Sequence, residues 1–225
     1  IIMGKLVVVP TPVGNLEDIT FRALNILKQA DIILCEDTRV TQKLLTHFDI
    51  QQKLASYHQH NEHKQLPKFL EMVGTHEIVA LVSDAGTPAI SDPGFLLVRE
   101  CIENELEVEC LPGPTALIPA LVTSGLPNNA FTFIGFLPPK KGRQTKLKEV
   151  MENKYTTVFY ESPHKLLKTL GQLCELEPDR QISVSREISK MFEETKRGTS
   201  QEVLKYFEEK GVKGEFVICV AGKSK

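Results

Sequence analysis

The strongest constraint on the fold is a pattern that occurs twice, in which a short apolar run leads into a turn rich in glycine and proline. The first run, Lys5–Val9, precedes the turn Pro10–Thr20, and the second, Ile78–Val82, precedes Ser83–Gly94. Glycine lets the backbone approach a ligand closely, and proline fixes the turn. Because ligands of open α/β sheets lie beyond the carboxyl ends of the strands, these turns predict a small-molecule site and therefore an enzyme.

The rest of the chain alternates between apolar runs and helix-like segments. Further strands are expected at Ile32–Cys35, Leu54–Tyr57, Val108–Leu111, Phe131–Phe136, Thr157–Tyr160, Ile182–Ser185, Phe192–Thr195 and Phe216–Ala221. Apolar spacing predicts helices over Thr20–Ala30, Phe95–Glu103, Gln144–Glu152, His164–Leu176 and Gln201–Lys210. In the first series this alternation favours a mostly parallel sheet covered on both faces. A second series begins around Ser124–Asn129, so we expect two α/β domains, 1–114 and 115–225.

Composition and missing motifs narrow the function. The formal net charge of −2 does not imply a broad electrostatic grip on nucleic acid. With no apolar run of membrane-spanning length and no signal peptide, a soluble cytoplasmic protein is expected. The five cysteines lie far apart, which favours reduced core thiols. Fingerprints for dinucleotides, for P-loop phosphates and for a serine nucleophile elbow are absent, so hydride transfer and phosphate hydrolysis have little support.

Several motifs carry a resemblance to a known family. The Pro10–Thr20 turn, followed by Arg22 and Ala23, resembles the start of the tetrapyrrole methylase superfamily, the class III S-adenosylmethionine methyltransferases. Within that superfamily, the chain is similar from Lys5 to about Ala221 to the enzymes that methylate a cytidine 2′-hydroxyl in 16S ribosomal RNA. The motifs that carry this narrower resemblance are Pro10–Thr20, Glu36–Arg39, Ser83–Gly94, Pro112–Ala116, Gly135–Pro138 and Tyr160–His164. Many such enzymes continue for several dozen residues beyond the point where this chain stops, so RNA contacts made there are expected to be missing.

The resemblance implies a fold of two α/β domains with S-adenosyl-L-methionine bound in the cleft between them. It also implies a set of cofactor-binding residues, which are Pro12, Asp84, Ala85, Gly86, Ile90, Ser91, Thr115, Ala116, Phe159, Tyr160 and Glu187. Apolar walls for adenine and few competing cations near the sulfonium make physical sense in such a site. The alternative for Asp84 is a carboxylate that only caps its own Gly/Pro turn.

Methyl transfer to a hydroxyl needs a group that accepts the proton, and Glu36, Asp37 and Arg39 follow the second strand at the same sheet end as the two turns. One carboxylate could take or orient the proton, while Arg39 could hold an RNA phosphate. The sequence leaves open which acid acts as the base. It also leaves open a purely structural role, in which these residues cap the following helix.

Basic residues indicate where RNA could be held. The expected RNA-binding residues are Lys140, Lys141, Arg143, Lys146, Arg186 and Lys190. A lysine-rich loop can also be ordinary solvated surface. His58, His60 and His63 would suit zinc if they converged, but methyl transfer needs no metal, and contacts with RNA bases or a solvated loop are the better interpretations.

The expected partners are 16S ribosomal RNA within the small ribosomal subunit and a second copy of the chain in a homodimer, with no membrane and no metal. Two alternatives remain. One keeps the cofactor but methylates a small molecule, and the other is a catalytically silent binding module with the same fold. Relatives that methylate small molecules are not expected to carry the basic loop at residues 140–148.

Overall fold

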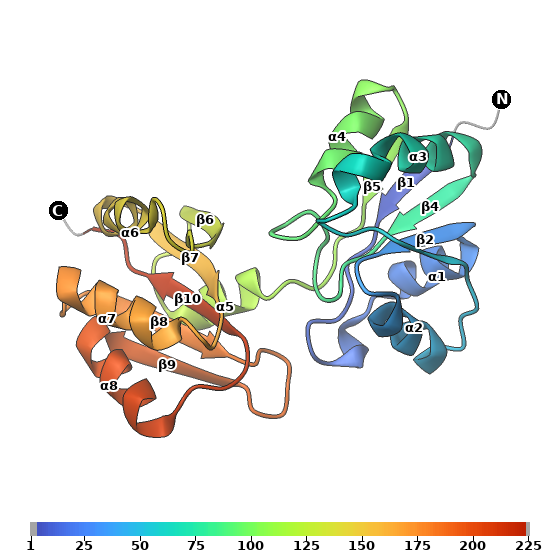
Figure 1. Cartoon of the computed structure of the whole chain (residues 1–225). Coiled ribbons are helices and arrows are strands. Elements are labelled where there is room, and N and C mark those ends of the chain that lie inside the picture. Colours follow the sequence, from blue (N-terminus) through green and yellow to red (C-terminus); the bar gives the residue numbers. More distant parts are fainter. Residues whose placement is uncertain (1–3, 224–225) are drawn as a thin grey trace. The chain divides into compact units, whose positions relative to one another are not determined.

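The computed structural model describes residues 4–223 and divides the chain into two compact units, with the boundary between Thr115 and Ala116 (Figure 1). We call the N-terminal one unit 1 and the C-terminal one unit 2. Each unit contains a five-stranded sheet with helices packed against it. The predicted fold class of two α/β domains is confirmed.

All strands of unit 1 are parallel, as predicted for the first series. They are β1 (Lys5–Val8), β2 (Ile32–Cys35), β3 (Leu54–Ser56), β4 (Ile78–Leu81) and β5 (Glu107–Cys110). Their order in the sheet is β3-β2-β4-β1-β5. Val8 of β1 pairs with Leu81 of β4 and with Cys110 of β5. The carboxyl ends of these strands are therefore level, and the loops that follow them leave the same edge.

Helices cover both faces of the unit 1 sheet because neighbouring strand residues point to opposite sides. The helices are α1 (Phe21–Gln29), α2 (Thr38–His47), α3 (Glu62–Thr75) and α4 (Phe95–Glu103), with a short 3₁₀ helix η1 (Leu16–Asp18) before α1. Val7 belongs to the core that α1 and α2 cover, whereas Leu6 belongs to the core under α3 and α4. Continuous apolar strands are the expected sequence pattern of a sheet buried on both faces.

Three helix starts shape the loops at the carboxyl edge. The side chain of Thr20 accepts a hydrogen bond from the N–H of Ala23 at the start of α1, and Asp37 accepts one from Arg39 at the start of α2. Helix α4 follows Gly94, whose φ of 137° lies in the left-handed half of backbone space. A Cβ there would also lie 3.2 Å from the Cβ of Ala89, so glycine is required for this close approach.

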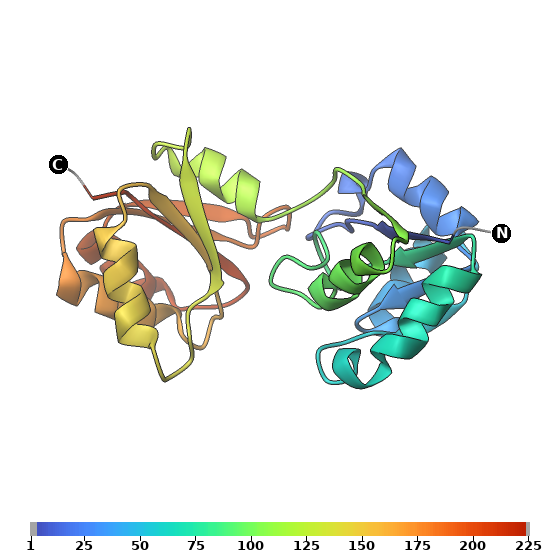
Figure 2. The ribbon, with the colours of Figure 1, turned by 90° about the horizontal axis from the view of Figure 1, so that it is seen from above.

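The sheet of unit 2 is mixed. Its strands are β6 (Phe131–Phe136), β7 (Thr156–Glu161), β8 (Gln181–Arg186), β9 (Glu194–Thr199) and β10 (Phe216–Val220), in the order β6-β7-β10-β8-β9. Only the β6–β7 pair is parallel. The helices are α5 (Leu117–Ser124), α6 (Arg143–Glu152), α7 (Leu166–Leu176) and α8 (Ser200–Lys210). Helix α5 packs on one face and the other three pack on the opposite face (Figure 2).

Some elements differ from the sequence prediction. The strand expected at Phe192–Thr195 is wrong in position, because β9 starts at Glu194 and Phe192 is an exposed loop residue. Helices α3 and α5 were not predicted, and each contains a proline, Pro67 and Pro119. Proline is tolerated in the first turn of a helix, where its missing N–H has no partner to lose, and Pro119 lies in that turn.

Candidate active site

The carboxyl edge of the unit 1 sheet brings three loops together. Strands β2, β4 and β1 are neighbours in the sheet, and the loops that follow them begin at Glu36, Val82 and Val9. Because the strands are parallel, their loops must emerge side by side. This edge is therefore the candidate active site.

Hydrogen bonds tie the two Gly/Pro turns to each other. The backbone N–H of Thr11 donates to the carbonyl of Gly86 at 2.9 Å, and the N–H of Gly86 donates back to Thr11 at 2.9 Å. The Thr11 hydroxyl donates to the carbonyl of Ser83 at 3.2 Å. Pro12, next to Thr11, and Ala85, next to Gly86, therefore lie on adjoining turns, although each follows a different strand.

The Ser83–Gly94 loop holds a strained backbone. Ala89 and Ser91 have φ angles of 69° and 63°, a region that residues with a Cβ rarely adopt. Each such residue costs about 1–3 kcal/mol, and strain of this kind concentrates at ligand-binding sites. Ile90, between them, exposes 43% of its surface. The loop thus presents the predicted residues Ile90 and Ser91 in a conformation that its surroundings must enforce.

Asp37 connects the loop after β2 to the loop after β4. Its backbone N–H donates to Oδ1 of Asp84 at 3.0 Å. Its own carboxylate accepts from Nε and Nη2 of Arg39, at 3.0 Å and 2.6 Å. This ion pair, with the hydrogen bond from the Arg39 backbone, lowers the pKa of Asp37 to about 2. Asp37 is therefore ionised at any physiological pH and is a weak proton acceptor.

Three other carboxyl groups at this edge have pKa values above their ordinary range. Burial is the largest cause for Glu36, followed by the charge of Asp84; His58 acts in the opposite direction. Burial also raises the pKa of Asp84, partly offset by the hydrogen bond from the Asp37 backbone. For Asp92, burial and then the charge of Glu36 raise the pKa to about 6.

The arrangement of these carboxyl groups has a chemical consequence. Carboxylates that repel one another and are partly desolvated favour a bound proton or a cationic ligand. Glu36, Asp84 and Asp92 together suit a ligand that carries positive charge. A carboxylate with a raised pKa is also a better proton acceptor, so Glu36 is better suited than Asp37 to act as a general base.

Two members of this edge were not among the predicted site residues. Asp92 belongs to the second Ser-Asp pair of the Ser83–Gly94 loop, and the repetition of that pair was the available signal. His58 follows β3, which neighbours β2 in the sheet, and its charge acts on Glu36. The sequence analysis named His58 but could not place it beside Glu36, because the strand order was unknown.

The predicted cofactor residues of unit 2 lie on β7 and after β8. Tyr160 is half-buried, and its ring contacts the rings of Phe133 and Phe136. Glu187 has a φ of 51° and accepts hydrogen bonds from the N–H of Glu215 at 2.8 Å and from Nζ of Lys190 at 3.1 Å. Thr115 and Ala116 are the half-buried residues on either side of the unit boundary.

The prediction for Phe159 needs correction. Its side chain is fully buried in the core that α6, α7 and α8 cover, because β7 lies inside the sheet and alternate side chains face the helices. The Phe159 ring is therefore unavailable to a ligand, and only its backbone could take part. Neighbouring Tyr160 points to the other face of the sheet, where it packs with the α5 core.

The prediction for Arg143 is wrong as well. Arg143 is buried and cannot meet a phosphate in solvent. Its guanidinium donates to Thr169 Oγ1 at 2.6 Å and to Gln172 Oε1 at 2.9 Å, and lies 3.6 Å from the buried carboxylate of Glu161. The charge is inside because Arg143 begins α6, which packs against α7.

The other predicted RNA-binding residues are more varied. Lys140 and Lys141 are exposed, whereas Lys146 forms an ion pair with Glu149. Lys190 is paired with Glu187 and Glu215. Arg186 donates from Nε to the carbonyl of Lys213 at 2.6 Å and lies near Glu194. Of the predicted RNA-binding residues, Lys140 and Lys141 alone are both exposed and outside the ion pairs of residues 4–223.

The described part of the chain contains neither a candidate metal site nor a candidate membrane-spanning helix. Within residues 4–223, no three His, Cys, Asp or Glu side chains are grouped so that they could hold a metal ion. None of the helices in this range has the length and apolarity needed to cross a membrane.

Comparison with known proteins identifies the family. Residues 5–204 match the family described as Tetrapyrrole (Corrin/Porphyrin) Methylases. The chain belongs to the tetrapyrrole methylase family. The resemblance predicted from the motifs is thereby confirmed, and so is the fold. The tetrapyrrole methylase fold accounts for two different α/β units in one chain of this length.

Curated relatives within the family cover nearly the whole chain. Ribosomal RNA small subunit methyltransferase I of Halalkalibacterium halodurans is 48% identical over 97% of this chain and 76% of the relative. The protein of the same name from Thermotoga maritima is 44% identical over 98% of this chain and 100% of the relative. The predicted resemblance to this group, for which Ser83–Gly94 was the most specific of several motifs, is confirmed.

Solved structures share the fold at low identity. A diphthine synthase has a TM-score of 0.75 at 14% identity, with 96% of this chain and 90% of that chain covered. Uroporphyrin-III C-methyl transferase from Thermus thermophilus, complexed with S-adenyl homocysteine, has a TM-score of 0.67 at 19% identity, with 97% of each chain covered. At these identities, the likeness extends to the fold and no further.

Proposed function

We propose that this protein is an S-adenosylmethionine-dependent methyltransferase that modifies the ribose 2′-hydroxyl of a cytidine in 16S ribosomal RNA of the small subunit. The observation that carries the proposal is the identity of 44–48% over nearly the whole chain with relatives named Ribosomal RNA small subunit methyltransferase I. The solved structures are 19% identical or less, so their names lend no weight to a small-molecule acceptor.

The residues at the carboxyl edge of unit 1 fit the proposed cofactor. S-adenosylmethionine carries a positive sulfonium and supplies the methyl group. Asp84 and Asp92, whose pKa values are raised, would be stabilised in their ionised form by the positive charge of such a ligand. The strained turn at Ile90 and Ser91 offers backbone groups and an apolar side chain to the same ligand.

The proposed cofactor-binding residues come from both units. From unit 1 they are Pro12, Asp84, Ala85, Gly86, Ile90, Ser91 and Thr115, and from unit 2 they are Ala116, Tyr160 and Glu187. The Glu187 carboxylate accepts hydrogen bonds from the Glu215 N–H and from Lys190, which hold it in one orientation for a contact with the cofactor.

Glu36 is the proposed general base. Its raised pKa favours proton acceptance, and its carboxyl group carries no bound cation of its own in the way that Asp37 does. Glu36 would accept the proton of the 2′-hydroxyl as the oxygen bonds to the methyl carbon and the bond between that carbon and the sulfonium sulfur breaks. Asp37 is proposed to fix Arg39 through their ion pair, so that the remaining N–H groups of Arg39 can hold a phosphate next to the reacting ribose.

The proposed partners follow from this substrate. The enzyme acts on small-subunit particles in the cytoplasm and works as a homodimer. The homodimer is supported by exposed apolar side chains of unit 2, Val122 on α5 and Phe136 on β6, which a second copy of the chain could cover.

The test uses purified protein, S-adenosylmethionine with a labelled methyl group, and small ribosomal subunits from a strain that lacks the gene. We expect label in 16S ribosomal RNA and a new stop at a cytidine in primer extension at low nucleotide concentration. Subunits from the parent strain, whose site is already methylated, are the matched control and should accept no label. Equal labelling of both particles, or label only in small molecules, would overturn the proposal.

A further inference from the structure

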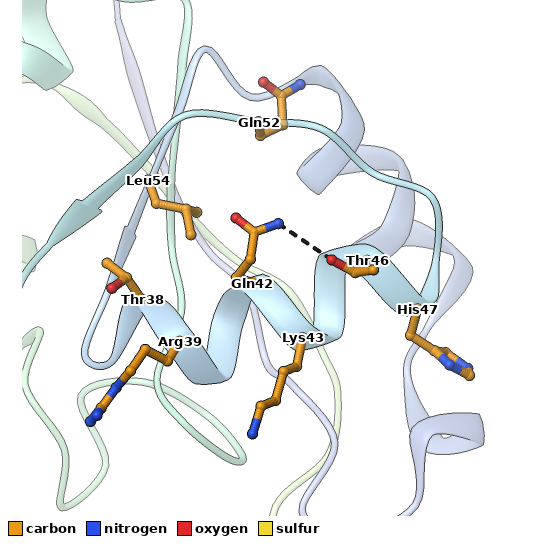
Figure 3. Close-up of a pocket in the computed structure, with 8 residues that line it drawn as sticks. All are labelled: Thr38, Arg39, Gln42, Lys43, Thr46, His47, Gln52 and Leu54. Atoms are coloured by element: carbon orange, nitrogen blue, oxygen red, sulfur yellow. Dashed lines mark hydrogen bonds between the residues drawn. The ribbon is translucent and has the colours of Figure 1, made fainter.

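A groove lined mainly by side chains with polar ends runs along helix α2, beside the candidate active site (Figure 3). It has a volume of about 860 Å³ and is lined by Thr38, Arg39, Gln42, Lys43, Thr46, His47, Gln52 and Leu54. Apart from Leu54, every lining side chain carries a hydroxyl, amide or basic group. The polar ends of these side chains can bond to a ligand, while their aliphatic parts form much of the groove wall.

The basic side chains of the groove are regularly spaced. Arg39, Lys43 and His47 are four residues apart and project from the same side of α2 (Figure 3). With a rise of 1.5 Å per residue, successive members are separated by about 6 Å along the helix axis. All three side chains are exposed. Arg39 and Lys43 therefore place positive charge at two points along one line, and the His47 ring extends this line with further hydrogen-bonding groups.

The charge of the row is available to a ligand. Among residues 4–223, the ion pairs leave out Lys43 and His47. Arg39 is paired with Asp37 through Nε and Nη2, which leaves further N–H donors of its guanidinium unused. Gln42 and Thr46, which also line the groove, are four residues apart on α2, and the Gln42 amide donates a hydrogen bond to the Thr46 hydroxyl at 3.4 Å (Figure 3).

The row starts at the candidate active site. Arg39 contacts Asp37, which follows Glu36 in the chain and bonds to Asp84 through its backbone. A nucleotide whose ribose lies at Glu36 would therefore place its neighbouring phosphates at the start of α2. The alternative surface at residues 140–146 is weaker, because Arg143 is buried and Lys146 is paired with Glu149.

We propose that the α2 groove binds the phosphodiester backbone of a single-stranded RNA segment that adjoins the methylated nucleotide. This inference rests on the proposed function for its choice of RNA. One line of positive charge matches one strand, and the hydroxyl and amide groups of Gln42, Thr46 and Gln52 can bond to ribose and phosphate oxygens. The formal net charge of the chain is −2, so the protein as a whole does not attract RNA. The basic side chains of the groove supply a local attraction for phosphate groups.

The test compares two charge reversals of the full chain, Lys43→Glu in the groove and Lys68→Glu as the matched control. Lys68 is an exposed lysine of α3, which covers the opposite face of the same sheet. The probe is a fluorescein-labelled single-stranded RNA of about 12 nucleotides, titrated by anisotropy at several KCl concentrations. For single strands, each phosphate contact contributes about 0.7 to the slope of log affinity against log salt.

We expect Lys43→Glu to weaken RNA binding about tenfold or more and to reduce the salt slope by about 0.7, while Lys68→Glu stays close to wild type. Equal losses in both variants, no measurable binding by wild type in 20 mM KCl, or equal binding of a duplex RNA would overturn the proposal. Calorimetry with S-adenosylmethionine and thermal melting accompany each variant, to confirm folding and an intact cofactor site. Because binding is measured without methyl transfer, a wild type that binds RNA through the groove but methylates no subunit would contradict the proposed function alone.

Discussion

Two clusters of charged side chains, one in each unit, illustrate two uses of charge. In unit 2, Arg143 and Glu161 are both buried, and their polar atoms bond to Thr169, Gln172 and the backbone. In unit 1, Glu36, Asp84 and Asp92 are partly exposed, and burial with repulsion from neighbouring carboxylates raises their pKa values despite the opposing effects of His58 on Glu36 and of Arg39 on Asp84. The charges of the unit 2 cluster balance each other and their hydrogen bonds are made within the protein. The unit 1 cluster has an excess of negative charge.

The difference indicates what each cluster is for. A buried ion pair whose hydrogen bonds are complete holds elements together, here α6, α7 and β7. A cluster of like charges costs stability unless a ligand or a proton relieves it, so its retention points to function. Mutations should therefore separate the two clusters, with loss of stability in unit 2 and loss of activity in unit 1.

The largest expected effect on stability comes from Arg143→Met. The change leaves the Glu161 carboxylate buried without its cation, which costs about 3–5 kcal/mol of unfolding free energy. Urea unfolding followed by circular dichroism measures it. The double variant Arg143→Met/Glu161→Gln removes both charges and should recover part of the loss. A single variant within about 1 kcal/mol of wild type would mean that the pair does not hold these elements together.

The smallest expected change in the free energy of unfolding comes from Asp92→Asn, and this variant should be more stable than wild type rather than less. Because the folded-state pKa of Asp92, about 6, lies above the ordinary value of 3.8, ionisation destabilises the folded protein as pH rises through this range. The asparagine variant should be more stable than wild type at pH 8, by on the order of 1 kcal/mol after allowance for solvent screening.

The pH dependence of that gain is the control for Asp92. At about pH 4 and below, the carboxyl group is protonated in the folded protein, so the advantage of asparagine should disappear. Thermal melting of both proteins at pH 4 and pH 8 tests the sign. A constant difference between the two proteins at both pH values would contradict the electrostatic explanation.

The sequence predicted the geometry of the unit 1 edge well. Apolar strands buried on both faces are recognisable from composition, and their alternation with helices predicts a parallel sheet. Parallel strands place their loops at one edge, which is why Glu36 and Asp84 could be grouped before the structure was known. The pairing of β2 with β4 explains the contact between Asp37 and Asp84, which the sequence alone did not specify.

The sequence could not predict the charge network of unit 2. Lys140 to Arg143 is one basic run in the sequence, but Gly142 turns the backbone with a φ of 81° and Arg143 starts a helix that faces the core. Its partners Glu161 and Thr169 lie 18 and 26 residues further along the chain. Phe159 was misjudged for a related reason, because the strand order that buries β7 depends on β10, which comes last in the chain.

The most direct test of the account is the rate of methyl transfer by Glu36→Gln, measured in single turnovers on small ribosomal subunits. A positioned base contributes a factor of about 10²–10⁴, so we predict a loss in that range, with cofactor affinity and melting temperature close to wild type. The wild-type rate should rise with pH as Glu36 loses its proton, and this dependence should vanish in the variant. Glu208→Gln, at an exposed position of α8, is the matched control and should keep full activity. A folded Glu36→Gln protein that methylates at the wild-type rate would contradict the claim that the carboxyl cluster of unit 1 performs the chemistry.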